Sequence, residues 1–235
     1  MEELFEFLST LVTNERKKKI EKVLSLRTKH FTIVAEDTYQ DHNASALVRT
    51  CDCFGIQEMR VIQKNNQYNV SKGMSGGAEK WVDTFTYIES EKGIANCLSD
   101  LKHAGYQIVA ATPDVEGIPI DEFDVSKKSA LFFGREREGL SPEILDAAEV
   151  KVKIPMVGFT ESFNISVAAA IIMSNITVRL RGHQTINWNL SEEEKRQKRF
   201  DWYLRSIPNY QRMLHAYLKD HPQLSMKEIK SLTEH

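Results

Sequence analysis

The chain has 235 residues, of which 41% are hydrophobic and 27% charged, and its formal net charge is −2. This length suits one catalytic domain with helical additions, and the small net charge argues against a protein that coats RNA by overall basicity. We expect no membrane span, because no apolar run is long enough to cross a bilayer, and no signal peptide, because the start at Met1 is acidic. Cys51, Cys53 and Cys97 follow no metal-ligand spacing, so we expect a reduced, cytoplasmic protein without metal.

Charge is unevenly distributed along the sequence. Residues 15–30 contain seven Lys or Arg and two acids, residues 179–219 contain nine and four, and residues 83–149 contain six and fourteen. Both ends are therefore basic and the middle is acidic. Solvated helix faces explain any single basic residue, but two basic segments around a ligand-binding core are as consistent with phosphate contact.

The first half of the chain begins with a helical pattern over residues 2–26. A buried strand is predicted at 31–36 and a second at 58–62. Between them, a helix is predicted from Asn43, placed as its N-cap, to Gly55. A short third strand is expected near 84–88, before a helix over 91–104.

The second half continues the alternation of strands and helices. Strands are predicted at 107–112, 129–133 and 150–154, with a loop at 113–119, and the last of these strands closes the sheet. Ser141-Pro142-Glu143 is typical of a helix start. The remaining helices are predicted at 164–181, near 191–219 and at 224–233. This order predicts an α/β fold with a mostly parallel sheet and helices on both faces.

Three segments carry the strongest functional signal. The first is the helix from His42 through Asn43 and Arg49 to Gly55. The second is a buried strand that runs into the glycine-bounded charged loop 134–141. The third is the stretch 154–172, in which a strand end, a Pro/Gly loop and a polar Ser162/Asn164/Ser166 cluster lead into a small-residue helix. Strand ends followed by helix N-termini are where open α/β sheets bind ligands.

Together and in this order, the three segments resemble the SpoU/TrmH family of RNA ribose 2′-O-methyltransferases, over about residues 16–181. The resemblance implies the SPOUT fold, whose C-terminal segment forms a trefoil knot. It divides the chain into a basic helical extension at 1–28, a SPOUT methyltransferase domain at 29–181 and a helical extension at 182–235. The flanking helices are similar to those of the branch that methylates a D-loop guanosine of tRNA.

The resemblance also implies S-adenosylmethionine as the cofactor, and it assigns the cofactor to three strand-end loops. Matching positions are Thr112, Gly134, Ile154, Met156 and Phe163. The family usually has Leu where this chain has Phe163, which points to altered packing of the pocket wall. Gly134 and Gly139 suit a close backbone approach.

A second set of matches carries the implied chemistry, namely Arg49, Asn43, Glu136, Ser162 and Asn164. An isolated arginine is usually a surface ion-pair partner, and Asn43 is also a plausible helix cap. Because a free arginine is a very poor base, a role for Arg49 in clamping phosphate and stabilising charge is favoured over proton abstraction. In the family, a segment similar to Ser75-Gly76-Gly77 lies next to the active site.

The implied partners are tRNA and a second copy of the chain, since the family builds its site near a dimer interface. For phosphate contact we select basic residues that flank the core, namely Arg16, Lys19, Arg27, Arg179 and Arg181. One alternative is a SpoU-type enzyme acting on ribosomal RNA, whose members commonly carry an N-terminal RNA-binding domain. Another is a non-catalytic RNA-binding protein, against which the complete catalytic set argues.

Overall fold

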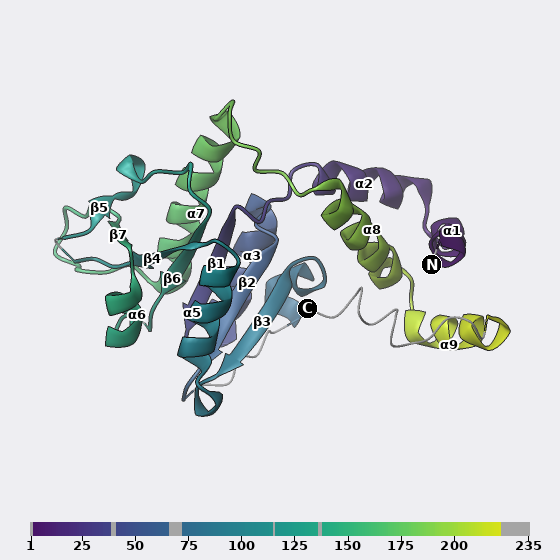
Figure 1. Ribbon diagram of the computed structural model, residues 1–235, viewed down its shortest axis with the longest axis horizontal. Coiled ribbons are helices and arrows are strands. Elements are labelled where there is room, and N and C mark those ends of the chain that lie inside the picture. The colour runs from purple at the N-terminus through teal and green to yellow at the C-terminus, as the bar shows by residue number, and fades with distance from the viewer. Residues whose placement is uncertain (1, 39–40, 66–71, 115, 136–137, 222–235) are drawn as a thin grey trace. The chain divides into compact units, whose positions relative to one another are not determined.

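The computed structural model describes residues 2–38, 41–65, 72–114, 116–135 and 138–221 (Figure 1). The chain divides into two compact units, one of Thr28–Trp188 and one of Met1–Arg27 with Asn189–His235. The N-terminal and C-terminal segments thus belong to the same unit. The helix predicted at 224–233 lies outside the described residues.

A parallel sheet forms the centre of the unit 28–188, as the sequence predicted. Its strand order is β3-β2-β1-β6-β4-β7-β5, and every strand pair is parallel. The strands are β1 (Phe31–Glu36), β2 (Glu58–Gln63), β3 (Asp83–Ile88), β4 (Gln107–Ala111), β5 (Ile118–Pro119), β6 (Ser129–Phe133) and β7 (Val150–Lys153).

Strand β5 corrects the prediction of a loop over 113–119. Ile118 pairs with Val152 and Pro119 with Lys153, so β5 and not β7 is the last strand of the sheet. Two residues are too few to show a period of two, and proline is tolerated at a sheet edge because its missing N–H faces away from the ladder. The trefoil knot implied by the family resemblance stays a prediction.

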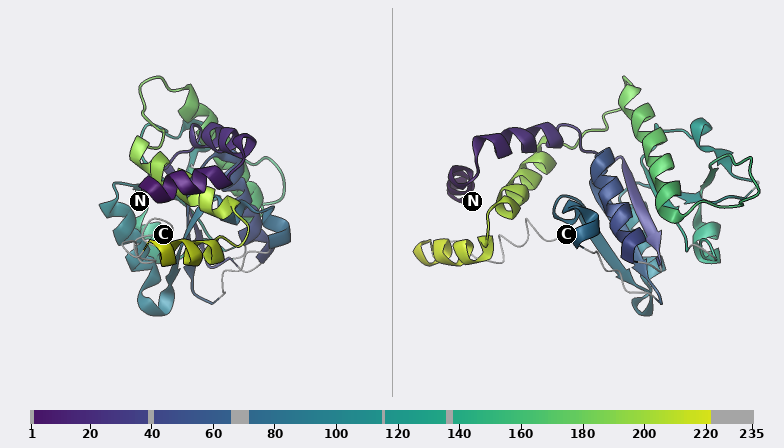
Figure 2. Two further views of the ribbon diagram at one scale, coloured as in Figure 1. Left: turned by 90° about the vertical axis from the view of Figure 1, so that its right-hand side faces the viewer. Right: turned by 180° about the vertical axis from the view of Figure 1, so that it is seen from behind.

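Helices cover both faces of the sheet. α3 (Asp41–Phe54) and α7 (Ile165–Gly182) pack on one face, and α5 (Gly93–His103) and α6 (Pro142–Ala147) on the other (Figures 1 and 2). Successive strand residues point to opposite faces. Accordingly, Ile33 joins the apolar cluster under α3 and α7, while Val34 joins the cluster under α5 and α6. Burial on both faces explains why the strands read as continuous apolar runs.

Shorter elements complete this unit. α4 (Lys72–Ser75) and the 3₁₀ turns η1 (Ala78–Lys80), η2 (Glu89–Glu91) and η3 (Ile120–Glu122) lie between the main elements. Gly76 and Gly77 have φ angles of 62° and 86° and connect α4 to η1. This left-handed pair ends α4 after four residues, because glycine adopts positive φ without a steric cost.

The sequence was expected to contain no segment that approaches a membrane span, but α7 has the length and hydropathy of one. Within the described ranges it is the one helix with a suitable length and hydropathy. Its apolar residues include Ala169, Ile172 and Met173, which are at most 1% exposed and belong to the core under the sheet. Length and composition are common to spans and core helices, and the face of α7 that carries these three residues packs in the core of the unit.

Four helices make up the described part of the terminal unit, namely α1 (Glu2–Leu11), α2 (Asn14–Leu24), α8 (Glu192–Ser206) and α9 (Tyr210–Asp220). The single helix predicted over 2–26 is therefore wrong, because Thr13 starts a new helix by accepting a hydrogen bond from the Arg16 N–H. The helix predicted over 191–219 is also divided. Asn209, with φ at 52°, separates α8 from α9 directly after Pro208.

α8 organises the terminal unit. Ser191 and Glu194 form a reciprocal capping box at its start. Trp202 is 2% exposed and lies 5.2 Å under the Arg27 guanidinium. Arg199 forms a two-point ion pair with Glu21 of α2, with one nitrogen–oxygen distance of 2.8 Å. The guanidinium of Arg199 on α8 is therefore bound to a carboxylate within the terminal unit.

Candidate active site

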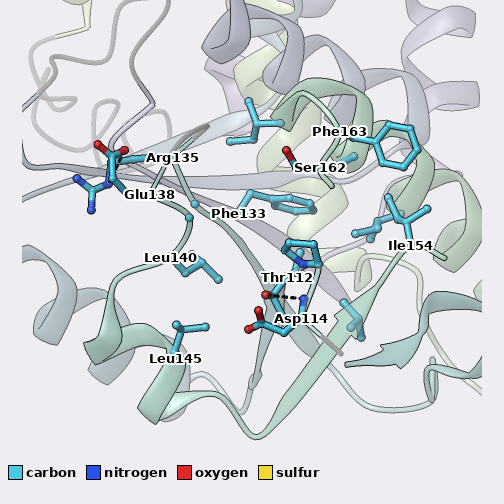
Figure 3. Close-up of a pocket in the computed structure, with 18 of the residues that line it drawn as sticks. Thr112, Asp114, Phe133, Arg135, Glu138, Leu140, Leu145, Ile154, Ser162 and Phe163 are labelled. Atoms are coloured by element: carbon cyan, nitrogen blue, oxygen red, sulfur yellow. Dashed lines mark hydrogen bonds and ion pairs between the residues drawn. The ribbon is translucent and has the colours of Figure 1, made fainter. Parts of the chain in front are cut away.

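A cavity of about 340 Å³ opens at the carboxyl ends of β4, β6 and β7 (Figure 3). The sequence-predicted cofactor residues all line it, together with Ser162. The set comprises Thr112, Gly134, Ile154, Met156, Phe163 and Ser162. Three loops that are far apart in sequence thus meet at one edge of the sheet, because parallel strands present their carboxyl ends together. The role of each residue remains a prediction.

Thr112 forms the wall that follows β4. Its backbone N–H donates to the Val152 carbonyl at 3.0 Å, which continues the β4–β7 ladder by one residue. Its hydroxyl accepts a hydrogen bond from the Asp114 N–H at 3.3 Å, as the dashed line in Figure 3 shows. This small Thr-turn directs the chain away from the sheet and brings the exposed Asp114 to the rim.

The Gly134 loop is closed by its own backbone. Arg135 and Gly139 exchange two N–H to carbonyl hydrogen bonds of 3.1 and 3.0 Å. A Cβ on Gly134 would lie 2.2 Å from the Gly139 carbonyl carbon, and Gly139 itself has φ at 69°. Both glycines are therefore required by the backbone path. Glu136, predicted as a catalytic orienter, lies outside the described residues.

The segment from Ile154 to Asn164 forms the third wall. Ser162 and Asn164 are exposed, and the Phe163 ring is 43% exposed at the mouth of the cavity. Asn164 is the N-cap of α7, as predicted. Its Oδ1 accepts from the Ser166 N–H at 2.9 Å and from the Ser166 hydroxyl at 2.6 Å. The Asn164 side chain thereby connects the end of this loop to the first turn of α7.

Asn43 reaches the same place from α3. Its prediction as a helix N-cap is wrong, because α3 starts at Asp41 and Asn43 lies within the first turn. Its side chain is 1% exposed, and its Oδ1 accepts from Asn164 Nδ2 at 3.3 Å. The two predicted asparagines therefore join the N-terminal ends of α3 and α7 across 121 residues of sequence.

Arg49 lies two turns further along α3 and is exposed. One guanidinium nitrogen donates to the Met74 carbonyl at 3.4 Å, and a Cβ on Gly76 would lie 3.7 Å from Arg49 Cζ. The Ser75-Gly76-Gly77 turn thus lies against this arginine, and the position of this turn next to the active site, which the family resemblance implied, stays a prediction. Arg49 is not among the residues that line the cavity, and its side chain is exposed to solvent.

The five predicted phosphate-binding residues fall into two groups. Arg16 and Lys19 are exposed on α2. For Arg27 the structure contradicts the prediction, because its side chain is 1% exposed under the aromatic ring of Trp202. At 1% exposure this guanidinium is not open to contact with a large ligand.

The two arginines at the end of α7 are partly buried and bound to the backbone. Arg179 donates to the carbonyls of Ile120, at 2.9 Å, and Phe123. Arg181 donates to the Phe54 carbonyl at 2.6 Å, and burial lowers the pKa of its guanidinium. Sequence could not reveal these partners, since they lie 56 to 127 residues away. Their geometry fits a structural role and not the predicted phosphate contact.

Further charged groups at the cavity escaped the sequence reasoning, namely Asp114, Arg135 and Glu138. Arg135 and Glu138 form a long ion pair of 4.0 Å across the loop. Glu36 was also missed; it is buried at the end of β1 and accepts a hydrogen bond from the Ser141 N–H. A polar residue directly after an apolar strand was the signal available for it. The described residues contain no group of three metal-ligating side chains.

Comparison with known proteins agrees with this arrangement. The sequence model of the SpoU rRNA Methylase family matches residues 30–174. The tRNA (guanosine(18)-2′-O)-methyltransferase of Borreliella burgdorferi is 41% identical over 204 residues, which cover 87% of this chain and 91% of that protein. The enzyme of the same name from Thermus thermophilus is 34% identical over 161 residues, or 68% of this chain and 81% of that protein.

A solved structure shows the same fold. The crystal structure of the A. aeolicus TrmH/SpoU tRNA modifying enzyme aligns with a TM-score of 0.74 and 30% identity, over 83% of this chain and 98% of that chain. The match of the family model to most of the chain confirms the resemblance seen in the sequence motifs. The chain belongs to the SpoU rRNA Methylase family.

Proposed function

We propose that this protein transfers a methyl group from S-adenosylmethionine to the 2′-hydroxyl of the guanosine at position 18 in the D loop of tRNA. The observation that carries the proposal is the cavity at the strand ends, lined by the neighbours of Asn164, which is hydrogen-bonded to Asn43, in a chain that belongs to a methylase family. The tRNA substrate is supported by relatives of 41% and 34% identity that are named for this reaction.

The residues of the cavity fit the cofactor. Small-molecule sites in proteins have volumes of roughly 300–1,000 Å³, and this cavity has about 340 Å³. Ile154, Met156 and Phe163 offer apolar walls for an adenine ring, while the Gly134 loop leaves its backbone accessible. When bound, S-adenosylmethionine supplies an electrophilic methyl group on a sulfonium.

The side chains around the cavity have distinct tasks in this scheme. Arg49 holds the phosphate next to the target ribose and stabilises negative charge as the hydroxyl loses its proton. Ser162 and Asn164 offer polar atoms at the mouth, and Asn43 keeps Asn164 in place through their 3.3 Å hydrogen bond. Glu136 is proposed to orient these groups. No metal is proposed to take part.

The two units divide the work. We assign catalysis to Thr28–Trp188 and tRNA contact to the terminal helices, where Arg16 and Lys19 are exposed on α2. Such a protein works in the cytoplasm, where tRNA is modified. Exposed apolar side chains support a homodimer, because Val157 and Phe159 are fully exposed and Phe163 and Val167 are 43% and 45% exposed.

A methyl-transfer assay on total tRNA and ribosomal RNA, with mapping of the modified nucleotide, tests the activity. We expect 2′-O-methylguanosine at position 18 of tRNA. Arg49→Ala should lower kcat by about 100-fold or more, the typical loss for a preorganised charge-stabilising group. Arg49→Lys should remain strongly impaired, because lysine keeps the charge but loses the planar fork. Near-normal turnover of either variant would remove Arg49 from the mechanism.

Cofactor binding can be measured separately by calorimetry with a chelator present. The wild-type protein should bind S-adenosylmethionine under these conditions. Gly134→Ala should weaken the affinity by at least about tenfold, or 1.4 kcal/mol, because the added Cβ forces the Gly139 backbone to move. Gly182→Ala is the matched control, since a Cβ there meets no atom within 4 Å. Loss of binding in the chelator, or equal affinity of the two variants, would contradict this assignment.

Light scattering tests the homodimer. The measured mass should be twice the 27.0 kDa of one chain. Phe159→Asp should shift the protein toward monomer, because it places a charge in the proposed interface. Ile88→Asp is the control, since Ile88 is 45% exposed on the strand at the other edge of the sheet. A monomeric wild-type protein at assay concentration would refute the proposal.

The tRNA-binding role of α2 predicts a change in salt dependence. Arg16→Ala with Lys19→Ala should weaken tRNA binding and reduce the slope of log affinity against log salt by about 0.9 for each lost phosphate contact. Arg196→Ala should have little effect, because Arg196 is ion-paired with Glu193 on α8. Cofactor affinity should not change. An unchanged salt slope in the double variant would show that these residues only solvate the helix.

A further inference from the structure

The turn that contacts Arg49 contains two consecutive left-handed glycines. Gly76 and Gly77 have φ angles of 62° and 86° and connect α4 to η1. Glycine has a wider range of backbone conformations than any other residue, so a pair of glycines does not by itself hold a turn in one shape. The contacts of the residues on either side therefore determine how firmly this turn is held.

Ser75 and Glu79 close the turn from its two sides. Ser75 is 1% exposed, and its hydroxyl donates to Glu79 Oε2 and accepts from the Gly77 N–H at 3.4 Å. A serine hydroxyl can donate one hydrogen bond and accept others, so the two bonds are compatible. Both glycines thus lie inside a ring that is closed by a hydrogen bond to a carboxylate. Such a bond is stronger than one between two neutral groups.

The end of the turn is anchored in the core. Ala78 directly follows the glycines, is 3% exposed and belongs to the same apolar cluster as Val48 of α3. Its carbonyl accepts from the N–H groups of Trp81 and Val82 at 2.9 and 3.1 Å. The Ser75–Glu79 hydrogen bond therefore connects the end of α4 to a segment that is already fixed against α3.

The Arg49 side chain lies on this turn. One guanidinium nitrogen donates to the Met74 carbonyl at 3.4 Å. A Cβ on Gly76 would lie 3.7 Å from Arg49 Cζ and 3.8 Å from Nε, so the guanidinium lies where a side chain at this position would point. Among the described residues Arg49 makes no ion pair. The turn thus holds the guanidinium through a neutral carbonyl, which leaves its positive charge available to a ligand.

We propose that Ser75 and Glu79 are positioning residues for the methyl transfer and that they act through Arg49. Their hydrogen bond fixes the Gly76-Gly77 turn, and the turn sets the direction of the planar guanidinium fork. An arginine that is oriented in advance loses less on binding a phosphate and stabilises developing charge better. This inference rests on the proposed function, in which Arg49 holds the phosphate next to the target ribose.

The test compares Ser75→Ala, Glu79→Ala and Glu79→Gln with the control Ser129→Ala. Ser129 is fully buried at the start of β6, and its hydroxyl donates to the Lys127 carbonyl at 2.8 Å. The control therefore removes a buried serine hydroxyl from the same unit, at the end of the strand opposite to the cavity. Each variant is measured below its melting temperature for S-adenosylmethionine affinity by calorimetry, and for single-turnover methyl transfer to tRNA.

Ser75→Ala and Glu79→Ala should each lower the rate of methyl transfer by about tenfold and leave cofactor affinity within about twofold, because a misplaced charge-stabilising group loses part of its effect. Glu79→Gln should recover most of the rate, because its amide oxygen still accepts from the Ser75 hydroxyl. The double variant Ser75→Ala/Glu79→Ala should lose no more than either single variant, since both remove the same hydrogen bond.

A second set of variants in the Arg49→Ala background tests whether the two residues act through the arginine. There Ser75→Ala should change the remaining rate by less than about twofold, because the group that the turn positions is gone. An equal loss in the two backgrounds would overturn the inference, since Ser75 would then act on the reaction by another route. A wild-type rate in Arg49→Ala itself would also overturn it.

Ser129→Ala should lower the melting temperature and change neither the rate nor the cofactor affinity. If the Ser75 and Glu79 variants change only the melting temperature, as this control does, the inference is wrong and the proposed function stands. The same holds if Glu79→Gln recovers nothing, because a hydrogen-bonded turn would then not explain the loss. A wild-type protein that binds the cofactor but methylates no RNA would refute the proposed function, and this inference with it.

Discussion

The parallel pairing of β1 with β2 on one edge and with β6 on the other is the constraint on which the site depends. All six residues of β1 are buried, so their backbone groups can be satisfied only by the two neighbouring strands. That pairing fixes the direction of β6 and, through it, of β4 and β7. The loops after these strands must then emerge at one edge of the sheet. The cavity follows from the ladder as a geometric consequence.

A small number of polar contacts between residues distant in sequence fixes the helices next to this edge of the sheet. The Asn43–Asn164 hydrogen bond connects the starts of α3 and α7, the two helices that share one face of the sheet. At the other end of α7, Arg179 donates to the carbonyl of Ile120, the first residue of η3, and Arg181 to the carbonyl of Phe54, the last residue of α3. Cations near a helix C-terminus also favour the helix dipole. α7 is therefore held at both ends, which keeps its N-terminal end steady beside the cavity.

The sequence was most informative where structure is local. The strands of 31–36, 58–62, 107–112 and 129–133 follow from apolar runs, and the N-cap at Asn164 follows from a polar residue before an apolar helix. The convergence of Thr112, Gly134 and Ile154 could be expected because strand ends meet in parallel sheets.

Other features depend on partners distant in sequence. The burial of Arg27 under Trp202 and the binding of Arg179 to carbonyls need the folded chain, so a basic run looked like a ligand surface. Asn43 looked like a cap because its amide partner is 121 residues away. At Thr13 the apolar periodicity continues as in a single helix. The Thr13 side chain nevertheless accepts a hydrogen bond from the Arg16 N–H, and this cap starts a second helix.

The chemical character of the cavity lining has a consequence for proton transfer. Among the described lining residues, the ionisable ones are Asp114, Arg135 and Glu138, and no histidine, cysteine or lysine is present. The described walls therefore offer no imidazole, thiol or amine to take the proton of the attacking hydroxyl, and within them the carboxylates of Asp114 and Glu138 are the acceptors left for it.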